Sequence, residues 1–309
     1  AEVIILCVPP TPAIDRTLHV SALRAGEVHR ADAVLAAAGG KGLNVARTIL
    51  ALGGEPLCMG LIGGHAGNLL AELAGREGLS AEWTRMKNET RTCVILVEDG
   101  SDATVINERG AEVSAAECEA FVQDVWKQSE RVQLVCVSGS LPPGFSAHLF
   151  QSLLLGLVER QKSVWVDTSG AALSAALNVN GINLKVNRSE LSEVLGVDIS
   201  DAEQAQRVSE QLREKGVASV VVTLGKEGAI LTMDRSAWLA KSPEIKIVSS
   251  VGSSDAFLGG LVYALEAGNP PELALRYGVA AGAANALQFG GGKVQKEKIE
   301  RLFEKSTLQ

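Results

Sequence analysis

The residues best suited to carry out chemistry lie at positions 252–255, where the sequence reads Gly-Ser-Ser-Asp at the start of a helix-like stretch. The backbone N–H groups of Gly252, Ser253 and Ser254 would point at one spot there and could stabilise a phosphoryl group. Asp255 could accept a proton from an attacking hydroxyl within hydrogen-bond reach. Ser and Asp are also common at helix starts, so a plain helix cap is the alternative for this segment alone.

A second glycine-rich segment, residues 38–46 with the sequence AGGKGLNVA, also leads directly into a predicted helix. Its glycines let the backbone approach a ligand closely, and the helix start offers free N–H groups to anionic or polar atoms. Lys41 adds a cation and Asn44 adds a side-chain amide. Taken alone, the segment is equally consistent with a tight turn that happens to contain a lysine.

Three further segments place glycine or polar residues directly after buried strands: 138–144 (SGSLPPG), 185–190 (KVNRSE) and 223–228 (TLGKEG). In open α/β sheets, ligands bind in the crevice outside the carboxyl ends of the strands. Five polar or glycine-rich segments of this kind exceed what turn formation requires. Together they predict a ligand site at one edge of a sheet.

Several well-known motifs are missing from the sequence. It has no GxxxxGK[ST], no GxGxxG after the first predicted strand, and neither the HRD nor the DFG element. Residues 252–256 resemble a nucleophile elbow, but none of the four histidines follows them, as a Ser…Asp…His order requires. The histidines also lack metal-ligand spacing. These observations argue against a P-loop enzyme, a dinucleotide-binding enzyme, a protein kinase, a serine hydrolase and a zinc site.

The elements that must position these residues alternate between strands and helices, so the predicted fold class is α/β. Apolar runs predict strands at 3–8, 57–62, 134–138, 164–167, 183–186 and 220–223. Helical patterns cover 43–52, 67–77, 117–128, 205–215, 256–266, 272–287 and 296–304. Capping boxes are expected at Ser114 with Glu117 and at Asp201 with Gln204. Continuous apolar strands between helices indicate a mostly parallel sheet with helices on both faces.

Two segments interrupt this alternation. Residues 18–20 with 27–36, and 92–98 with 102–108, alternate apolar and polar side chains without an intervening helix. We expect them to form antiparallel strands outside the main sheet, as a small β lid over approximately 16–37 and 89–108. Such a layer has an apolar face that must be covered, so it acts as a lid or as a contact between subunits.

Composition limits the partners of the protein. The 309 residues include 29 Lys and Arg against 36 Asp and Glu, a net charge of −7, which argues against a nucleic-acid or anionic-membrane surface. Every apolar stretch is interrupted well before the roughly 18 residues of a transmembrane helix. The apolar start lacks a basic lead-in and is expected to be a buried strand, not a signal peptide. Five scattered cysteines indicate reduced core thiols and a cytoplasmic setting.

In their order and spacing, these clusters resemble the PfkB (ribokinase-like) carbohydrate kinases over nearly the whole chain. The resemblance rests on Pro12-Ala-Ile-Asp15, the GG-K-G-x-N element near residue 40, NxxE at 187–190, TLGxxG at 223–228 and the late GxxD helix. The forms GGKGLNVAR and SGSLPPG, with Arg91 in Glu-Thr-Arg-Thr, resemble the hexose-phosphate branch, which includes phosphofructokinases and tagatose-6-phosphate kinase. The resemblance implies one ribokinase-like domain over residues 1–309.

The same resemblance implies a role for each matching residue in an ATP- and Mg²⁺-dependent transfer to fructose 1-phosphate, fructose 6-phosphate or tagatose 6-phosphate. Asp255 would be the catalytic base, beside an anion hole of Gly252, Ser253 and Ser254. The sugar hydroxyls would contact Asp15, Gly39, Gly40 and Asn44, and the sugar's phosphate would pair with Lys41, Arg91 and Arg30. The nucleotide would contact Lys185, Asn187, Thr223, Gly225, Gly228 and Asn285. Glu190 would organise Mg²⁺ and its water.

One departure from the family pattern bears on activity. The family's anion hole usually reads G-A-G-D, and Ser254 replaces the second glycine here. If position 254 required a positive φ, a serine there would cost about 1 kcal/mol or more. A catalytically weakened relative that binds sugar phosphate or nucleotide is therefore the alternative to an active kinase. A homodimer formed through the β lid is also expected.

Overall fold

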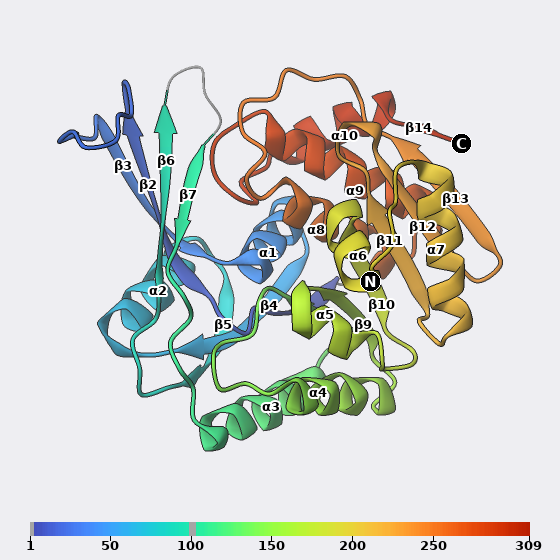
Figure 1. Cartoon of the computed structure of the whole chain (residues 1–309), viewed down its shortest axis with the longest axis horizontal. Helices are drawn as coiled ribbons and strands as arrows, with labels where there is room; N and C mark the ends of the chain where they lie inside the picture. Colours follow the sequence, from blue (N-terminus) through green and yellow to red (C-terminus); the bar gives the residue numbers. More distant parts are fainter. Residues whose placement is uncertain (1–2, 99–102) are drawn as a thin grey trace.

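The protein is built on a large sheet, with a smaller one beside it, and the computed structural model describes residues 3–98 and 103–309 (Figure 1). The strands of the large sheet are β1 (Ile4–Val8), β4 (Glu55–Ile62), β5 (Ser80–Arg85), β8 (Leu134–Ser138), β9 (Ser163–Asp167), β10 (Asn183–Asn187), β11 (Ser219–Thr223), β12 (Ala229–Met233), β13 (Ser236–Lys241) and β14 (Thr307–Leu308). Their order is β14-β13-β12-β11-β10-β9-β8-β1-β4-β5. Neighbours from β5 to β11 are parallel, which confirms the predicted α/β class. The pairs from β11 to β14 are antiparallel.

Helices cover both faces of the large sheet because successive strand residues point to opposite sides. Along β1, Leu6 and Val8 belong to one core, and Ile5 and Cys7 belong to the other. The first core lies under α3 (Ala115–Ser129), α4 (Ala147–Glu159), α5 (Gly170–Ala176), α6 (Arg188–Leu195) and α7 (Ala202–Glu214). The second lies under α1 (Lys41–Leu52), α2 (Gly64–Arg76), α8 (Ser253–Glu266) and α9 (Pro271–Ala286). Helix α10 (Lys296–Lys305) packs outside α9.

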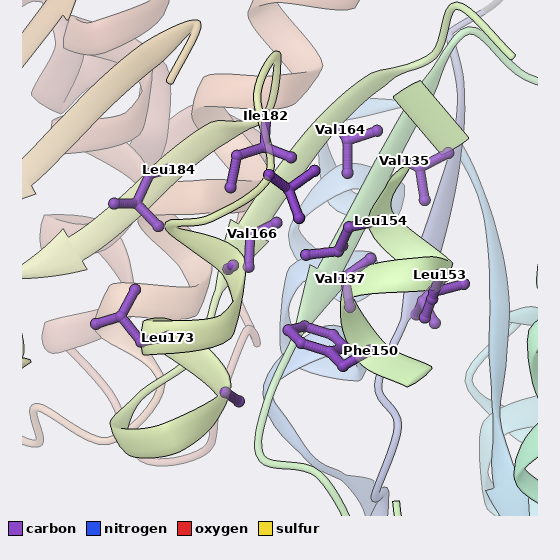
Figure 2. Packing of buried hydrophobic residues seen from close by; sticks show 14 of the residues in the cluster. Val135, Val137, Phe150, Leu153, Leu154, Val164, Val166, Leu173, Ile182 and Leu184 are labelled. Carbon is purple, nitrogen blue, oxygen red and sulfur yellow. The ribbon is translucent and has the colours of Figure 1, made fainter. Parts of the chain in front are cut away.

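The first core shows how the apolar strands hold the scaffold of the site in place (Figure 2). Phe150 and Leu154 of α4 lie against Val137 of β8 and Val166 of β9, and all four side chains are almost completely buried. Burying each such side chain contributes about 1.5–3 kcal/mol to the free energy of unfolding. This packing holds β8 and β9 in place relative to α4.

Capping residues set two of the helix starts. Ser114 and Glu117 form the predicted capping box of α3. Asp201 accepts from the backbone N–H of Gln204 at the start of α7, as expected. The reciprocal half of that prediction is wrong, because the Gln204 side chain accepts from the N–H of Ser200 instead of Asp201.

The small sheet is the predicted β lid, with strands β3 (Ala33–Gly39), β2 (Ala13–Val20), β6 (Thr92–Glu98) and β7 (Thr104–Asn107) in that order. Figure 1 shows it extending from one side of the main body. The antiparallel pairs β2–β3 and β6–β7 confirm the expectation, but β2 and β6 are parallel, since α2 and β5 carry the chain back before β6 begins.

The predicted lid strand over 27–36 is wrong for residues 27–32, which lie in the loop before β3. Strand β2 ends at Val20, and its last pair with β3 joins His19 to Ala33, so little of β2 remains to pair with the earlier residues. Position 102, where the other predicted lid strand begins, lies outside the described residues.

Sequence patterns did not identify β5, α4, α5, the β12–β13 hairpin or β14. None of the helices in the described residues is long and apolar enough to cross a membrane. All five cysteines have free thiols and are buried in the core, as predicted.

Candidate active site

Two helices begin side by side at the centre of the candidate site. Gly40 (φ 110°) precedes α1 and Gly252 (φ 79°) precedes α8, and both dihedrals favour glycine. Further along, a Cβ on Gly259 would lie 2.7 Å from the Thr48 Cβ, so the two helices pack very closely. Their positive N-terminal ends therefore face the same region, which is suited to bind an anion.

Asp255 lies in the first turn of α8 and contacts the glycine-rich segment through Asn44. Its Oδ2 accepts a hydrogen bond of 2.8 Å from Nδ2 of Asn44, and both side chains are buried. Burial raises the pKa of Asp255 to about 6, and the negative charge of Asp167 adds to this. Lys41 and Lys185 act in the opposite direction. At neutral pH the carboxylate is ionised and still basic enough to take a proton.

A buried cluster of charges lies beside Asp255, and its centre is a residue that sequence patterns did not identify. Asp167, at the end of β9, is fully buried and accepts from Lys185 Nζ at 2.7 Å and from Lys41 Nζ at 3.2 Å. Burial alone would raise the pKa of Asp167, but the two lysines hold it below its usual value. For Lys41 the directions are reversed. Burial alone would lower its pKa, but the nearby carboxylates, of which Asp167 has the largest effect, raise it. Asp167 thus holds two ammonium groups together.

The turn that precedes α8 is the segment predicted to form an anion hole. Ser254 lies inside α8, and of the residues described only Gln161 and Asp234 have a positive φ without being glycine. The anticipated backbone strain at Ser254 is therefore absent, and its hydroxyl accepts from Lys185 Nζ. The N–H of Ser253 already donates to the carbonyl of Ser250. The N–H groups of Gly252 and Ser254 are therefore the stronger anion-hole candidates.

Asn285, predicted to contact a nucleotide, is completely buried behind this turn. Its Nδ2 donates to the Val251 carbonyl at 2.8 Å and to Ser253 Oγ at 3.2 Å, and its Oδ1 accepts from the N–H of Gly292. Asn285 thus supports the turn before α8 and the loop that contains Gly292. Neither role is visible in the sequence, because the loop reaches Asn285 only through the fold.

The predicted sugar-side residues meet at the base of the lid. A Cβ on Gly39 would overlap the carboxylate of Asp15, so this glycine lets the acidic side chain lie against the backbone. Burial raises the pKa of Asp15 to about 6, against the effects of Arg47 and Arg91. Arg91 donates to the carbonyls of Thr11 and Glu108. These contacts place a cation beside Asp15.

Within the described part of the chain, Arg30, also predicted to bind the phosphate, forms no hydrogen bond or ion pair with the other predicted sugar-side residues. It is exposed in the loop between β2 and β3 and does not lie on a lid strand.

Apart from Asn285, the predicted nucleotide residues lie toward the carboxyl ends of β10 and β11, where Asn187 pairs in register with Thr223. Asn187 and Glu190 form a capping box at the start of α6, so one carboxylate oxygen of Glu190 is occupied. The other lies 3.9 Å from Lys41 Nζ, which brings Glu190 to the charge cluster. Gly225 (φ 63°) and Gly228 (φ 111°) form the turn that follows β11. This group lies next to the cluster through Lys185 and Glu190.

Arg47 is a second buried charge that sequence patterns did not identify. It lies on α1, three residues after Asn44, and donates to Asn44 Oδ1 at 2.8 Å. It also forms an ion pair with Glu77. The i, i+3 spacing places Arg47 and Asn44 on one face of a helix and could have revealed the contact. The available signal was an arginine that follows the glycine-rich element three residues after Asn44.

Comparison with known proteins matches this arrangement to one family. The profile of the pfkB family carbohydrate kinases matches residues 6–298. A 1-phosphofructokinase of Escherichia coli (strain K12) is 31% identical over 298 residues, which are 96% of each chain. The tetrameric inhibited form of phosphofructokinase-2 from Escherichia coli superposes with a TM-score of 0.90 at 26% identity, over 98% of this chain and 99% of that chain. Ribokinase from Thermotoga maritima shares the fold alone, with a TM-score of 0.77 at 22% identity over 98% and 100% of the two chains.

The match covers both the glycine-rich helix starts and the strand ends around the charge cluster, so it includes the whole candidate site. The fold is therefore the ribokinase-like α/β fold predicted from the sequence. Kinases of this type transfer a phosphoryl group to a sugar hydroxyl, and the relatives named above support a sugar-phosphate kinase activity. The chain belongs to the pfkB family of carbohydrate kinases.

Proposed function

We propose that the protein transfers the γ-phosphoryl group of ATP to a hydroxyl of a ketohexose phosphate, with Asp255 as the general base. The observation that carries the proposal is the contact between Asn44 and Asp255, which joins the sugar-side segment to the anion-hole helix. Asn44 holds one carboxylate oxygen of Asp255, so the other can receive the proton of the sugar hydroxyl. A carboxylate whose pKa is about 6 is well matched to proton abstraction near neutral pH.

The charge cluster supports phosphoryl transfer as the reaction. Phosphoryl transfer is catalysed mainly by positioning the reactants and stabilising the negative charge on the transferred group. Lys41 and Lys185 share the counter-ion Asp167, and Lys41 is more exposed than Lys185, at 36% against 1% of the side chain. Lys41 is therefore the cation that can turn toward a bound phosphate, and Lys185 is the one held in place.

The acceptor is proposed to carry its own phosphate, bound by Arg91 and Lys41. A guanidinium can bind a phosphate through two parallel hydrogen bonds, whereas an ammonium acts as a point charge. Arg91 lies between the lid and the segment after β1, and its Nε is buried without a hydrogen-bond partner in the described residues. The similarity to a 1-phosphofructokinase makes fructose 1-phosphate the first substrate to test, followed by fructose 6-phosphate and tagatose 6-phosphate.

ATP is proposed to bind with Mg²⁺ at the ends of β10 and β11. Mg²⁺ prefers oxygen ligands and usually keeps several waters when it binds a nucleotide. One oxygen of Glu190 is held by the capping box and the other faces Lys41, so Glu190 suits contact through a water better than direct coordination. When bound, the ion would neutralise charge on the phosphates, and Asn187 and Glu190 would orient its waters.

The lid is proposed to form a homodimer contact. Its outer strands are β3 and β7, and they expose the apolar side chains of Val34, Leu35, Val105 and Ile106. Exposed edge strands with apolar side chains tend to associate unless something covers them. A second copy of the lid would cover these residues.

The test is a kinase assay that supplies ATP and Mg²⁺ with each of the three sugar phosphates in turn. Turnover of at least one sugar, abolished by Asp255→Asn, supports the proposal. Binding of a sugar phosphate without turnover of any of the three would instead support a catalytically weakened binding protein. Unphosphorylated fructose is the control, because a site with Arg91 and Lys41 should turn it over far more slowly.

A further inference from the structure

The guanidinium of Arg47 lies at a junction of four elements behind the proposed base. Its side chain is only 7% exposed on α1. It pairs through two nitrogens with the carboxylate of Glu77, just after α2, and donates to the carbonyl of Ala38 on β3. It also donates to the carbonyl of Gly291 at 3.3 Å and to Oδ1 of Asn44 at 2.8 Å. Its position is therefore fixed from several directions.

Both ends of the Asn44 side-chain amide form hydrogen bonds. Its oxygen accepts from Arg47 Nη1, and its nitrogen donates to Asp255 Oδ2, each at 2.8 Å. An asparagine amide can be turned over with little change in shape, which exchanges its donor and acceptor ends. A guanidinium can only donate. Arg47 is therefore compatible with only one of the two orientations, the one in which the amide nitrogen of Asn44 faces Asp255.

We propose that Arg47 is a positioning residue for phosphoryl transfer, because its contact with Asn44 keeps the Asn44 amide nitrogen, and not the oxygen, against Asp255. This inference rests on the proposed function, in which Asp255 is the general base. The orientation holds one oxygen of Asp255 and leaves the other for the sugar hydroxyl. If the amide turned over, its oxygen would face a carboxylate, and the two acceptors would repel each other.

The charges around the two groups determine what the loss of Arg47 does. Asp255 is faced by Asp167 from β9, by Lys41 and Asn44 from α1, and by Lys185 from β10. The hydrogen bond from Asn44 favours the ionised form of Asp255. Losing this bond would therefore raise the pKa of Asp255.

Arg47 itself is faced by the carboxylate of Glu77, and its charge also acts on Asp15. The charges of Arg47, Glu77 and Asp15 all act on the pKa of Asp255 less strongly than the hydrogen bond from Asn44 does. A change in the titration of the base would therefore report on the Asn44 amide.

Arg47 also supports the loop behind the anion hole. A Cβ on Gly291 would lie 2.6 Å from the Asn44 amide nitrogen, so this loop packs directly on the asparagine. A purely structural role for Arg47 would therefore predict a loss of stability. It would not predict a change in the pH dependence of the reaction, and this difference separates the two roles.

The experiment compares wild type, Arg47→Met and Arg47→Lys, using kcat as a function of pH at saturating ATP and sugar phosphate. For Arg47→Met we expect kcat to fall about tenfold and the acidic limb to move up by about half a pH unit or more. KM for ATP should change less than about threefold, since the nucleotide residues are elsewhere. Lysine is also a pure donor, so Arg47→Lys should keep the acidic limb within about 0.2 pH units of wild type.

Arg160→Met is the control for the loss of an arginine far from the site, although Arg160 is exposed and Arg47 is buried. Arg160 also donates to a backbone carbonyl, that of Gly156, and lies over the Trp126 ring on the far side of the sheet. It should lower the melting temperature without moving the acidic limb. If Arg47→Met does not fold, Arg47→Gln replaces it. A glutamine can present an oxygen to Asn44, so it also no longer fixes which end of the Asn44 amide faces Asp255.

Each result decides between the two roles. An acidic limb that moves in Arg47→Met, or in Arg47→Gln, and returns in Arg47→Lys supports the positioning role. An unmoved limb with lowered stability means that Arg47 is only structural. Full activity of Asp255→Asn would instead overturn the proposed function itself, whatever the Arg47 variants show.

Discussion

Neutralising Asp167 should make the protein less stable while extending its activity to lower pH. Asn has nearly the same shape as Asp, so Asp167→Asn removes the charge and leaves the packing of the β9 end intact. The carboxylate is fully buried, and Lys185, which is 1% exposed, donates to it at 2.7 Å. Removing one partner of a buried ion pair costs about 3–5 kcal/mol, and an acceptor oxygen remains, so we expect a loss of about 3 kcal/mol.

The ion pair between Asp167 and Lys41 adds little to this loss of stability, because the Lys41 side chain is 36% exposed and its charge is screened by water. For a chain of 309 residues, about 3 kcal/mol corresponds to a melting temperature lower by about 5 °C. The folded-state pKa of Asp167 is held below its usual value, so its stabilising effect is present above about pH 4 and is lost as the pH falls further. The difference in melting temperature should therefore be constant from about pH 5 to about pH 8 and should shrink below about pH 4.

The kinetic effect has the opposite sign. Asp167 raises the pKa of Asp255, so the variant should have a lower pKa at the base and an acidic limb of kcat/KM below the pH of about 6 that is expected for wild type. Differential scanning calorimetry and initial rates from about pH 4.5 to about pH 8 measure the two effects on the same preparations. The substrate's own phosphate titrates alike for both proteins, so only the difference between them is interpreted. A limb that stays in place or moves to higher pH would refute the electrostatic coupling of Asp167 to Asp255.

Three further outcomes follow from the site. Arg91→Ala should raise KM for the sugar phosphate at least about tenfold and KM for ATP less than about threefold, and equal rises would mean that the phosphate is bound elsewhere. Ser254→Ala should keep kcat within about twofold and cost about 1 kcal/mol or less in urea unfolding, because the backbone N–H remains and Lys185 keeps Asp167; a tenfold drop in kcat would give the hydroxyl a role in the reaction. Combining Val34→Asp with Ile106→Asp should convert a lid-mediated dimer into monomers in sedimentation velocity, whereas an unchanged assembly would place the contact on another surface.

The sequence was most informative where local chemistry determines local structure. Gly40 and Gly252 start α1 and α8 because those positions need a positive φ, and that requirement is visible in the glycine clusters. The strands of the parallel part of the large sheet, except β5, were visible as continuous apolar runs. Ser114 and Glu117 capped α3 as expected, since both halves of a capping box lie within four residues.

The main site features that could not be predicted from the sequence depend on contacts between distant segments. Asp167 ends a strand like many other acidic residues, and only the fold brings it between Lys41 and Lys185. Asn285 matched a family position, but its hydrogen bonds to Val251 and Gly292 need a loop that packs back on the helix. Strand β5 was missed because its edge position leaves mixed polar and apolar side chains. Helix α4 was missed because its apolar content, LFQSLLLGLV, does not distinguish a buried helix from a strand.

The role of Asp255 as the general base is tested most directly by the rate of phosphoryl transfer in a single turnover by Asp255→Asn. The substituted side chain would keep an oxygen for the Asn44 amide but could not take a proton, so the site should remain assembled. We expect a rate at least about 100-fold below wild type, with the Kd of the sugar phosphate changed less than about threefold by calorimetry. A single-turnover rate within about threefold of wild type would contradict the assignment of Asp255 as the base.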